Sequence, residues 1–172
     1  MQKTNFNLPM NGKSELDKVD LRILDMLQAD ARTPNAEIAR RVGMAPSAVL
    51  ERIRKLEKRG VIQGYSARIN PKALDLGLTC FTFVRTEEPV GSVESGQDLA
   101  DIPEVLEVHH TAGQDCYLLK VRVADTEHLS RLLKRFGRVP QVRDTRTTIV
   151  LTTVKETLGL PIAQAAADDA KE

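Results

Sequence analysis

The stretch "VGMAPSAVLERIRKLEKRG", residues 42–60, decides the fold of the N-terminal part of this chain. A glycine and a proline stand ahead of an amphipathic run, and its apolar residues Val49, Ile53 and Leu56 recur at helical spacing. The polar side of the same run is rich in Arg and Lys. The pattern predicts a helix that begins near Pro46, with one side buried and the other side basic.

Two shorter helical patterns come before this stretch. In the first, apolar residues recur at intervals of three or four, and Asp17 with Asp20 can cap its first turn. The second covers roughly residues 35–42, with Thr33 as the predicted cap and Pro34 at the first helical position. The glycine of the quoted stretch then ends this helix and starts a tight turn.

The segment after the basic helix alternates like a β-hairpin. Residues 61–69, "VIQGYSARI", are rich in β-branched residues, and Gly64 stands at the expected turn. Three helices with a tight central turn, followed by a hairpin, are the order of a winged helix-turn-helix. We therefore predict this domain over residues 15–69, a flexible tail over 1–14 and a linker over 70–77.

The second half of the chain, residues 78–154, predicts a different domain. The expected order is strand, helix, strand, strand, helix, strand, over residues 78–87, 92–102, 105–112, 116–123, 129–136 and 142–154. This β-α-β-β-α-β order indicates an α+β, ferredoxin-like (ACT-like) antiparallel sheet with two helices on one face. We expect the bare face to be covered by a second copy of the chain. The Ala-rich tail over residues 155–172 predicts at most a partial helix.

Charge is divided unevenly along the 172 residues. Residues 1–70 carry a net charge of +5 and residues 71–172 a net charge of −4, so the +1 of the whole chain conceals a basic N-terminal half. Such asymmetry is expected when one part of a protein binds a polyanion. No apolar run approaches the ~20 residues of a membrane span. The N-terminus lacks a signal-peptide pattern, and Cys80 and Cys116 are expected to be reduced thiols, so we predict a cytoplasmic protein without membrane contact.

The basic helix is predicted to bind double-stranded DNA. A recognition helix enters the major groove with its N-terminal end first. The residues expected near base edges are Ser47, Ala48, Glu51 and Arg52. The residues expected to contact phosphates are Lys55, Lys58 and Arg59, with Arg68 of the hairpin as a wing contact. A solvated charged face without a partner is the alternative, and the helix-turn-helix context favours DNA.

At this point the chain resembles a known family. "LDKVDLRILDMLQADART", residues 16–33, followed by "AEIARRVGMAPSAVLERIRKLEKRGVIQGYSARINPKALDLG", residues 36–77, is similar to the Lrp/AsnC (leucine-responsive, feast-famine) transcription regulators. The resemblance covers roughly residues 16–154. It implies a winged helix-turn-helix joined to a ligand-sensing domain that forms homodimers, which assemble into tetramers or octamers. It also implies a small effector, an amino acid or a related molecule, bound between dimers.

Two positions depart from the family pattern. Ala45 stands where the family usually has a Ser that caps the recognition helix, which costs about 1 kcal/mol of helix stability. The effector loop "AGQDCYLL", residues 112–119, has Cys116 at the usual Asp position, so Asp115 is displaced by one residue and is expected to face the other way. The predicted effector-binding residues are Gly113, Gln114, Asp115, Cys116, Thr145 and Thr147. Asp115 would accept the effector's ammonium and the Gly113 amide would donate to its carboxylate, unless the loop is only a hairpin turn.

Two other classes of protein are alternatives to a DNA-binding regulator. An enzyme would need a nucleophile with a base, or grouped metal ligands, and His109, His110 and His128 form no such set, so we expect no catalysis, no metal and no cofactor. An architectural protein that binds DNA regardless of sequence or effector stays open, because the effector loop is altered. A comparison of specific with random DNA separates the two binding modes.

Overall fold

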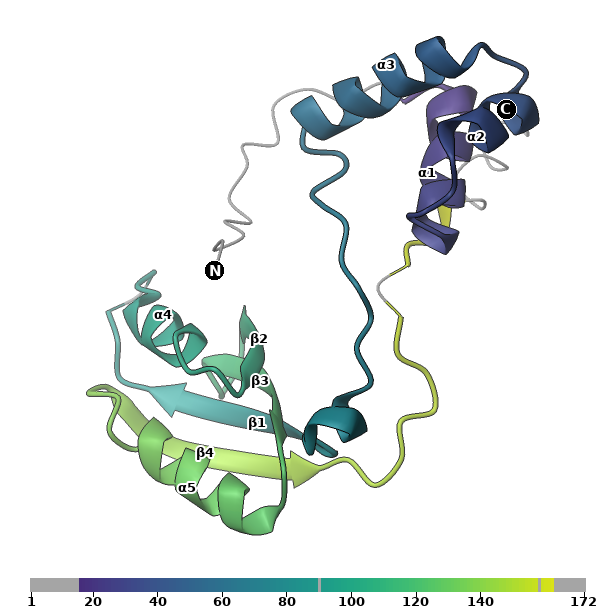
Figure 1. Cartoon of the computed structure of the whole chain (residues 1–172). Coiled ribbons are helices and arrows are strands. Elements are labelled where there is room, and N and C mark those ends of the chain that lie inside the picture. Colours follow the sequence, from purple (N-terminus) through teal and green to yellow (C-terminus); the bar gives the residue numbers. More distant parts are fainter. Residues whose placement is uncertain (1–15, 90, 158, 163–172) are drawn as a thin grey trace. The chain divides into compact units, whose positions relative to one another are not determined.

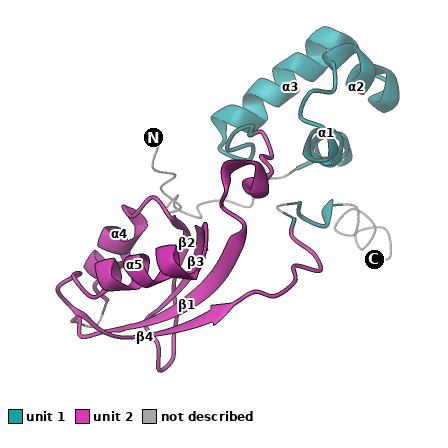
Figure 2. Ribbon diagram, turned by 60° about the horizontal axis from the view of Figure 1, so that its bottom comes forward, with its two compact units in different colours: residues 1–66, 157–172 teal, residues 67–156 magenta. Residues whose placement is uncertain are grey.

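The computed structural model describes residues 16–89, 91–157 and 159–162, and it divides the chain into two compact units (Figures 1 and 2). Unit 1 comprises residues 1–66 and 157–172, and unit 2 comprises residues 67–156. The predicted linker therefore belongs to unit 2, and residues 157 and 159–162 belong to unit 1. The predicted tail over residues 1–14 lies outside the described residues.

Unit 1 contains three helices: α1 (Lys18–Ala29), α2 (Asn35–Val42) and α3 (Pro46–Lys58). The predicted cap of α1 is confirmed as a capping box between Asp17 and Asp20. Gly43 ends α2 in the left-handed conformation, at φ 73°, as the tight turn requires. All three helices contribute to one buried core, which consists of Ile23, Ile38, Ala39, Val49, Ile53 and Leu56.

The start of α2 differs from the prediction. Pro34, not Thr33, is the residue that precedes the first turn of α2, and no side chain caps it. The Thr33 hydroxyl instead donates a hydrogen bond to the Asp30 carbonyl at 2.8 Å. The side chain of Thr33 is thus used in the turn between α1 and α2, so it does not satisfy the N–H groups of α2.

The predicted hairpin over residues 61–69 is wrong for this structure, which has no strand between residues 61 and 70. The two apolar residues that would have given the hairpin a packed face, Tyr65 and Ile69, are 51% and 63% exposed. An isolated two-stranded hairpin without a buried face is marginal in water. The side chain of Arg68, predicted as a wing contact, donates to the Glu156 carbonyl at 3.4 Å.

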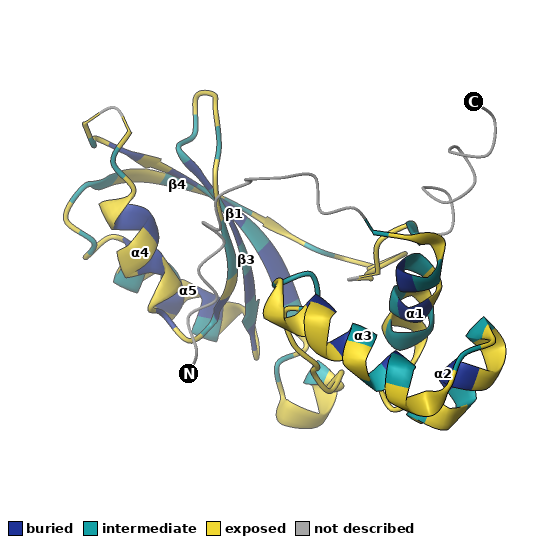
Figure 3. Cartoon of the chain, turned by 90° about the horizontal axis from the view of Figure 1, so that it is seen from above, coloured by how far each residue is buried: buried dark blue, intermediate teal, exposed yellow. Residues whose placement is uncertain are grey.

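Unit 2 confirms the predicted β-α-β-β-α-β order. The strands β1 (Leu78–Thr86), β2 (Val105–His110), β3 (Tyr117–Val123) and β4 (Val142–Ile149) form an antiparallel sheet in the order β2-β3-β1-β4. A 3-10 turn, η1 (Pro71–Leu74), precedes the sheet, and the two helices are α4 (Glu94–Ala100) and α5 (Thr126–Phe136). Leu99 of α4 and Leu132 of α5 pack into the same core as alternate residues of β1 and β3. Figure 3 shows the buried parts of these elements in dark blue.

Gly96 has a packing role that the sequence pattern did not show. A glycine in the middle of a helix ordinarily destabilises it, yet α4 continues through Gly96. A Cβ atom at Gly96 would lie 2.6 Å from Cε1 of Tyr117, a ring that is 1% exposed. The missing side chain therefore lets α4 approach the sheet. Burial raises the pKa of the Tyr117 hydroxyl to about 12, and this hydroxyl donates to Glu88 at 3.2 Å.

The face of the sheet opposite α4 and α5, called the open face below, carries the other alternate residues. Phe83 of β1 and Arg146 of β4 are cross-strand partners on it. Beyond β4, the carboxylate of Glu156 pairs with Lys120 and Arg122 of β3. The chain then enters unit 1, where the Gln28 amide exchanges two hydrogen bonds of 2.7 Å with the backbone of residue 160.

Candidate nucleic-acid interface and effector loop

The recognition helix α3 has two opposite sides. Val49, Ile53 and Leu56 are buried at spacing i, i+4, i+7. Each residue turns the helix by about 100°, so the residue two positions before each buried residue lies on the opposite side of α3. The same opposite side includes one more position, one turn further along the helix. The exposed stripe so defined consists of Ser47, Glu51, Arg54 and Lys58.

Arg54 is the residue of this stripe that the sequence analysis left out. It is exposed, and its spacing of seven from Ser47 and four from Lys58 places it on the same line along α3. The signal was present in the sequence, because the positions of Val49 and Ile53 fix the opposite side of the helix. A guanidinium in this position matches the paired acceptors of guanine in the major groove.

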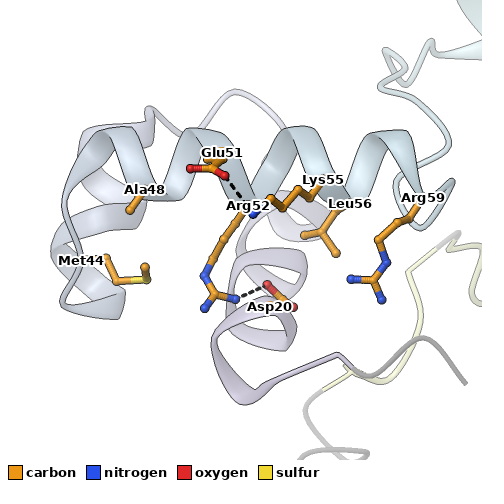
Figure 4. A pocket seen from close by; sticks show the side chains of 8 residues that line it. All are labelled: Asp20, Met44, Ala48, Glu51, Arg52, Lys55, Leu56 and Arg59. Carbon is orange, nitrogen blue, oxygen red and sulfur yellow. Dashed lines mark hydrogen bonds and ion pairs between the residues drawn. The ribbon is translucent and has the colours of Figure 1, made fainter.

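Arg52, predicted to lie near base edges, is instead directed toward α1. Its Nη1 lies 2.6 Å from Oδ2 of Asp17 and 2.7 Å from Oδ1 of Asp20, and Asp20 is only 7% exposed (Figure 4). The backbone N–H of Asp20 and the guanidinium of Arg52 lower the pKa of the Asp17 carboxyl. Arg52 therefore joins α3 to the capping box of α1.

The flank of α3 beside Arg52 is hollowed by a cavity of about 310 Å³. Its lining comes from α1, α3 and the adjoining turns, and three of the side chains are cationic (Figure 4). The lining residues are Asp20, Met44, Ala48, Glu51, Arg52, Lys55, Leu56 and Arg59. Lys55 also pairs with Glu51 at 2.8 Å, and both side chains are about two-thirds exposed. The predicted phosphate contacts Lys55 and Arg59 thus lie on this flank, and Lys58 lies on the exposed stripe.

The start of α3 confirms the missing cap. Ala45 is the residue that precedes the helix, and no side chain caps the first turn. Its backbone, at φ −71° and ψ 144°, already has the extended geometry that a capping Ser adopts. Ser47, the hydroxyl residue of the first turn, makes no capping hydrogen bond here. In this first turn Pro46 has no N–H to satisfy, and the Ala48 amide donates to the Ala45 carbonyl at 3.1 Å.

The predicted effector loop, residues 112–119, begins in the connection between β2 and β3 and continues into β3. This connection, residues 111–116, is fixed at both ends. The Thr111 hydroxyl donates to the Asp115 carbonyl at 2.7 Å, and the Thr111 amide donates to the Cys116 carbonyl at 2.9 Å. The Cys116 amide donates to the Val84 carbonyl of β1, also at 2.9 Å. Gly113 and Gln114 lie exposed at the tip.

Neighbouring side chains in this loop point in different directions. The Asp115 carboxylate reaches Nη2 of Arg146 at 2.7 Å, on the open face. The Cys116 sulfur turns the other way and lies 3.5 Å from the Thr86 amide of β1. Asp115 and Cys116 therefore do not present their side chains to one shared site within this chain.

Thr145 and Thr147 lie on the opposite face of the sheet from Arg146. In the register of β4 with β1, Thr147 pairs with Thr82, and their hydroxyl oxygens are 2.9 Å apart. Thr82 is fully buried under the helices. The expectation that these threonines line a pocket with Asp115 is thus wrong within one chain, because strand alternation turns them inward.

The histidines are engaged in local contacts. His128 lies 3.2 Å from Glu104, His109 lies 3.2 Å from Glu107, and the ring of His110 packs 5.1 Å from that of Tyr117. Among residues 16–89, 91–157 and 159–162, no group of three His, Cys, Asp or Glu side chains could hold a metal ion. Over the same ranges, no helix has the length and apolar character needed to cross a membrane.

A three-helix unit with a basic recognition helix, joined to an α+β sheet unit with an exposed charged loop, defines a DNA-binding regulator with a sensory domain. Family comparisons match both parts. Residues 16–63 match the model for winged helix-turn-helix DNA-binding domains, and residues 79–160 match that for the Lrp/AsnC ligand binding domain. The chain belongs to the Lrp/AsnC family of transcriptional regulators.

Individual relatives match this chain over nearly their whole length. The HTH-type transcriptional regulator FL11 of Pyrococcus horikoshii is 40% identical over 147 residues, which are 86% of this chain and 97% of the relative. The leucine-responsive regulatory protein of Escherichia coli is 39% identical over 151 residues, 86% of this chain and 92% of the relative. These relatives are transcriptional regulators by name.

Two similar solved structures contain L-methionine. A transcriptional regulator of Neisseria meningitidis in complex with L-methionine has a TM-score of 0.80 at 32% identity, and covers 87% of this chain and 99% of its own. The feast or famine regulatory protein of Mycobacterium tuberculosis, also complexed with L-methionine, has a TM-score of 0.78 at 40% identity, over 84% of this chain and 98% of its own.

Proposed function

We propose that this regulator binds specific DNA sites through the exposed stripe of α3 and that a small amino acid changes its DNA occupancy. The observation that carries the first part is the stripe itself, which lies opposite the buried side of a helix in a helix-turn-helix unit. A helix held in this way presents its outer side to the major groove.

The residues of α3 divide into two roles. Ser47, Glu51 and Arg54, with Ala48 beside them, would contact base edges, because they occupy the N-terminal and central part of the exposed surface. Lys55, Lys58 and Arg59 would contact phosphates, which fix the position of the protein without reading the sequence. Arg52 has no base contact in this proposal, since such a contact would require two ion pairs to open.

The effector site is proposed at the loop between β2 and β3, at Gly113, Gln114 and Asp115, since the Cys116 sulfur turns toward β1. This part is supported by the match of residues 79–160 to a ligand binding domain and by the L-methionine complexes of two similar structures. An ammonium group needs a carboxylate partner, and Asp115 supplies one in this loop. The effector is thus an amino acid, and no resident cofactor is required.

Assembly is proposed to proceed through the open face. Phe83 and Leu118 lie half-buried there, on the side of the sheet that α4 and α5 leave uncovered. A homodimer formed over this face would hold two copies of α3 at a fixed separation, which sets the spacing of DNA half-sites. Further association to tetramers or octamers would bring effector loops of different dimers together. The cytoplasm is the compartment in which such a regulator meets DNA.

The test is a binding comparison at one salt concentration. The full-length protein is titrated with fragments selected from a random pool and with unselected fragments of the same length, with and without each of the twenty amino acids. We expect the selected DNA to bind at least about a thousandfold more tightly. A ratio near one would support the architectural alternative and overturn sequence-specific regulation. Selective binding that no amino acid alters would overturn the effector part alone.

A further inference from the structure

A cation-lined cavity opens beside the recognition helix, between α3 and α1. It is the cavity of about 310 Å³ described above, and Arg52, Lys55 and Arg59 supply its cationic side chains (Figure 4). Residues 52–59 of α3 carry five cationic side chains and a single carboxylate. A surface of this charge attracts anionic segments, and a protein segment can serve as well as DNA.

The cations of this cavity are held only in part by neighbouring carboxylates. Nη1 of Arg52 makes the two ion pairs with α1 described above, and a guanidinium has further donors on its other nitrogens. Lys55 pairs with Glu51 at 2.8 Å, but the two side chains are 67% and 68% exposed. Exposed pairs of this kind contribute little and exchange readily with other ions. The cavity can therefore accept a further anion while the framework of unit 1 stays intact.

After unit 2 the chain returns to α1, which also lines this cavity. The Gln28 amide of α1 exchanges two hydrogen bonds of 2.7 Å with the backbone of residue 160. Gln28 and the lining residue Asp20 are eight residues apart in α1, which is about 12 Å along the helix axis. Eight residues of extended chain span up to about 29 Å. Residue 168 can therefore reach the cavity from residue 160.

The sequence after residue 162 has the composition of an anionic segment. Residues 163–172, called the acidic tail below, read "AQAAADDAKE", with three acidic residues and one lysine. Asp168 and Asp169 are adjacent, and alanines on both sides of them are small enough for a close approach to a surface. The acidic tail lies beyond residues 79–160, which match the ligand binding domain of the family. It is therefore a feature of this chain outside the matched domain.

We propose that the acidic tail binds the cation-lined flank of α3, where its two aspartates pair with Lys55 and Arg59. These are cations that the proposed function assigns to DNA phosphates, so the tail competes with DNA for one surface. This inference rests on the DNA-binding part of the proposed function. Because the tail is tethered to α1 through residue 160, its local concentration at the cavity is raised, and a weak contact suffices for competition.

Competition of this kind changes the salt dependence of DNA binding. Salt weakens the attraction of the tail to α3 as well as that of DNA to α3. The tail is therefore a strong competitor at low salt and a weak one at high salt. The affinity of the wild type for DNA should consequently fall less steeply with salt than the affinity of a protein whose tail lacks the charges.

The test compares the full-length wild type with Asp168→Asn/Asp169→Asn by fluorescence anisotropy on a selected DNA fragment. At about 50 mM salt we expect the double variant to bind about threefold to tenfold more tightly, because the competing carboxylates are gone. At about 300 mM salt the two proteins should bind equally. A double variant that binds like the wild type at both salt concentrations overturns the proposal.

Glu94→Gln/Asp98→Asn is the matched control, since it removes the same charge from two exposed positions of α4 in unit 2. It should show no gain of this size at low salt. An equal gain in the two double variants would mean that the total charge of the protein sets the affinity, and it would overturn a contact of the tail with α3. A gain that increases with protein concentration would assign the tail to a second copy, and would overturn binding within one chain.

Lys55→Gln tests where the tail binds. This change weakens DNA binding by itself, so the quantity to compare is the gain that Asp168→Asn/Asp169→Asn gives in each background. We expect the gain to fall to less than about half of its wild-type value when Lys55 is absent. An undiminished gain overturns binding at this flank and leaves the proposed function standing. A wild type that binds neither selected nor random DNA overturns the proposed function and this inference together.

Discussion

Two arginines, one in each unit, form ion pairs of nearly equal length in different surroundings. Arg52 reaches two carboxylates of α1, and the side chain of one of them, Asp20, is 10% exposed. Arg146 reaches a single carboxylate on an open sheet face, and its own side chain is 68% exposed. The distances, 2.6–2.7 Å, do not distinguish the two pairs.

The difference lies in what each pair would leave behind when it opens. Removing Arg52 leaves the nearly buried Asp20 carboxylate without its counter-ion in poorly solvated surroundings. Opening the Arg146 pair exposes two groups to water, at little cost. The first pair therefore belongs to the framework of unit 1, and the second contributes little to the stability of unit 2.

The largest effect is expected for Arg52→Ala. We expect unit 1 to lose about 2 kcal/mol of unfolding free energy, because Asp20 loses its counter-ion. Differential scanning calorimetry measures the loss as a lower Tm. Arg54→Ala, which removes the same charge from the exposed stripe of the same helix, is the control and should keep the wild-type Tm. Equal Tm values for the two variants would contradict the distinction.

The second effect is on DNA binding, where Arg54→Ala is expected to lose more affinity than Arg52→Ala. Arg54→Ala should weaken binding to a selected DNA site by about tenfold, with little change on random DNA, since a base contact is lost. An electrophoretic mobility shift at constant salt measures both. An equal loss on the two DNAs would assign Arg54 to phosphates, and an unchanged affinity would remove it from the interface.

A third, smaller effect is expected at the start of α3. Ala45→Ser should raise the stability of unit 1 by about 1 kcal/mol, because the backbone at this position already has the geometry of a capping residue. Thermal unfolding followed by circular dichroism measures the gain. Ala45→Gly, which lacks the hydroxyl, is the comparison variant. A gain in both variants would show that the hydroxyl is not its cause.

The pH dependence of unit 1 should be modest and confined to acid. The pKa of Asp17 is lowered in the folded state below its ordinary value of 3.8, first by the Asp20 N–H. The contribution of Asp17 to the free energy of unfolding is therefore complete above this ordinary pKa. It is lost as the pH falls through the lowered pKa of the folded state. Asp17→Asn should lack this part of the acid destabilisation. Parallel stability curves for the wild type and Asp17→Asn, measured by denaturation between about pH 5 and pH 2, would contradict it.

The smallest effect is expected on the stability of an Arg146 variant. Arg146→Gln should change the unfolding free energy by at most about 0.5 kcal/mol, because its pair is exposed. Urea denaturation of the wild type and the variant checks this. A loss as large as that of Arg52→Ala would mean that both pairs belong to the framework, and that the comparison between them does not hold.

Local patterns predicted most of unit 1. The spacing of Val49, Ile53 and Leu56 predicted α3, and the carboxylates of Asp17 and Asp20 predicted the capping box of α1. Both signals depend on residues within one or two helical turns. The hairpin failed for the opposite reason. Alternation over residues 61–69 resembles a strand, but a strand needs a partner and a packed face, and neither is specified by the segment itself.

The site was harder to predict than the fold. Arg52 and Arg54 are two positions apart with the same charge, and only the place of α1 decides which of them is tied down. The partner of Asp115 lies 31 residues away on another strand, so no spacing in the loop could indicate it. Thr145 and Thr147 were assigned to the site by resemblance, and the register with β1 turned them under the helices.

The return of the chain end to unit 1 changes how the two units can influence each other. The polypeptide leaves unit 1 after residue 66 and re-enters it at residue 157, where Gln28 holds the backbone of residue 160. In topological terms, the sensory unit is an insertion within the DNA-binding unit. A single linker limits only how far two bodies separate, whereas two linkers also resist twisting of one body against the other. The segment after β4 therefore connects unit 2 to unit 1 a second time, independent of the linker that follows α3, and it reaches α1 through the two hydrogen bonds of Gln28.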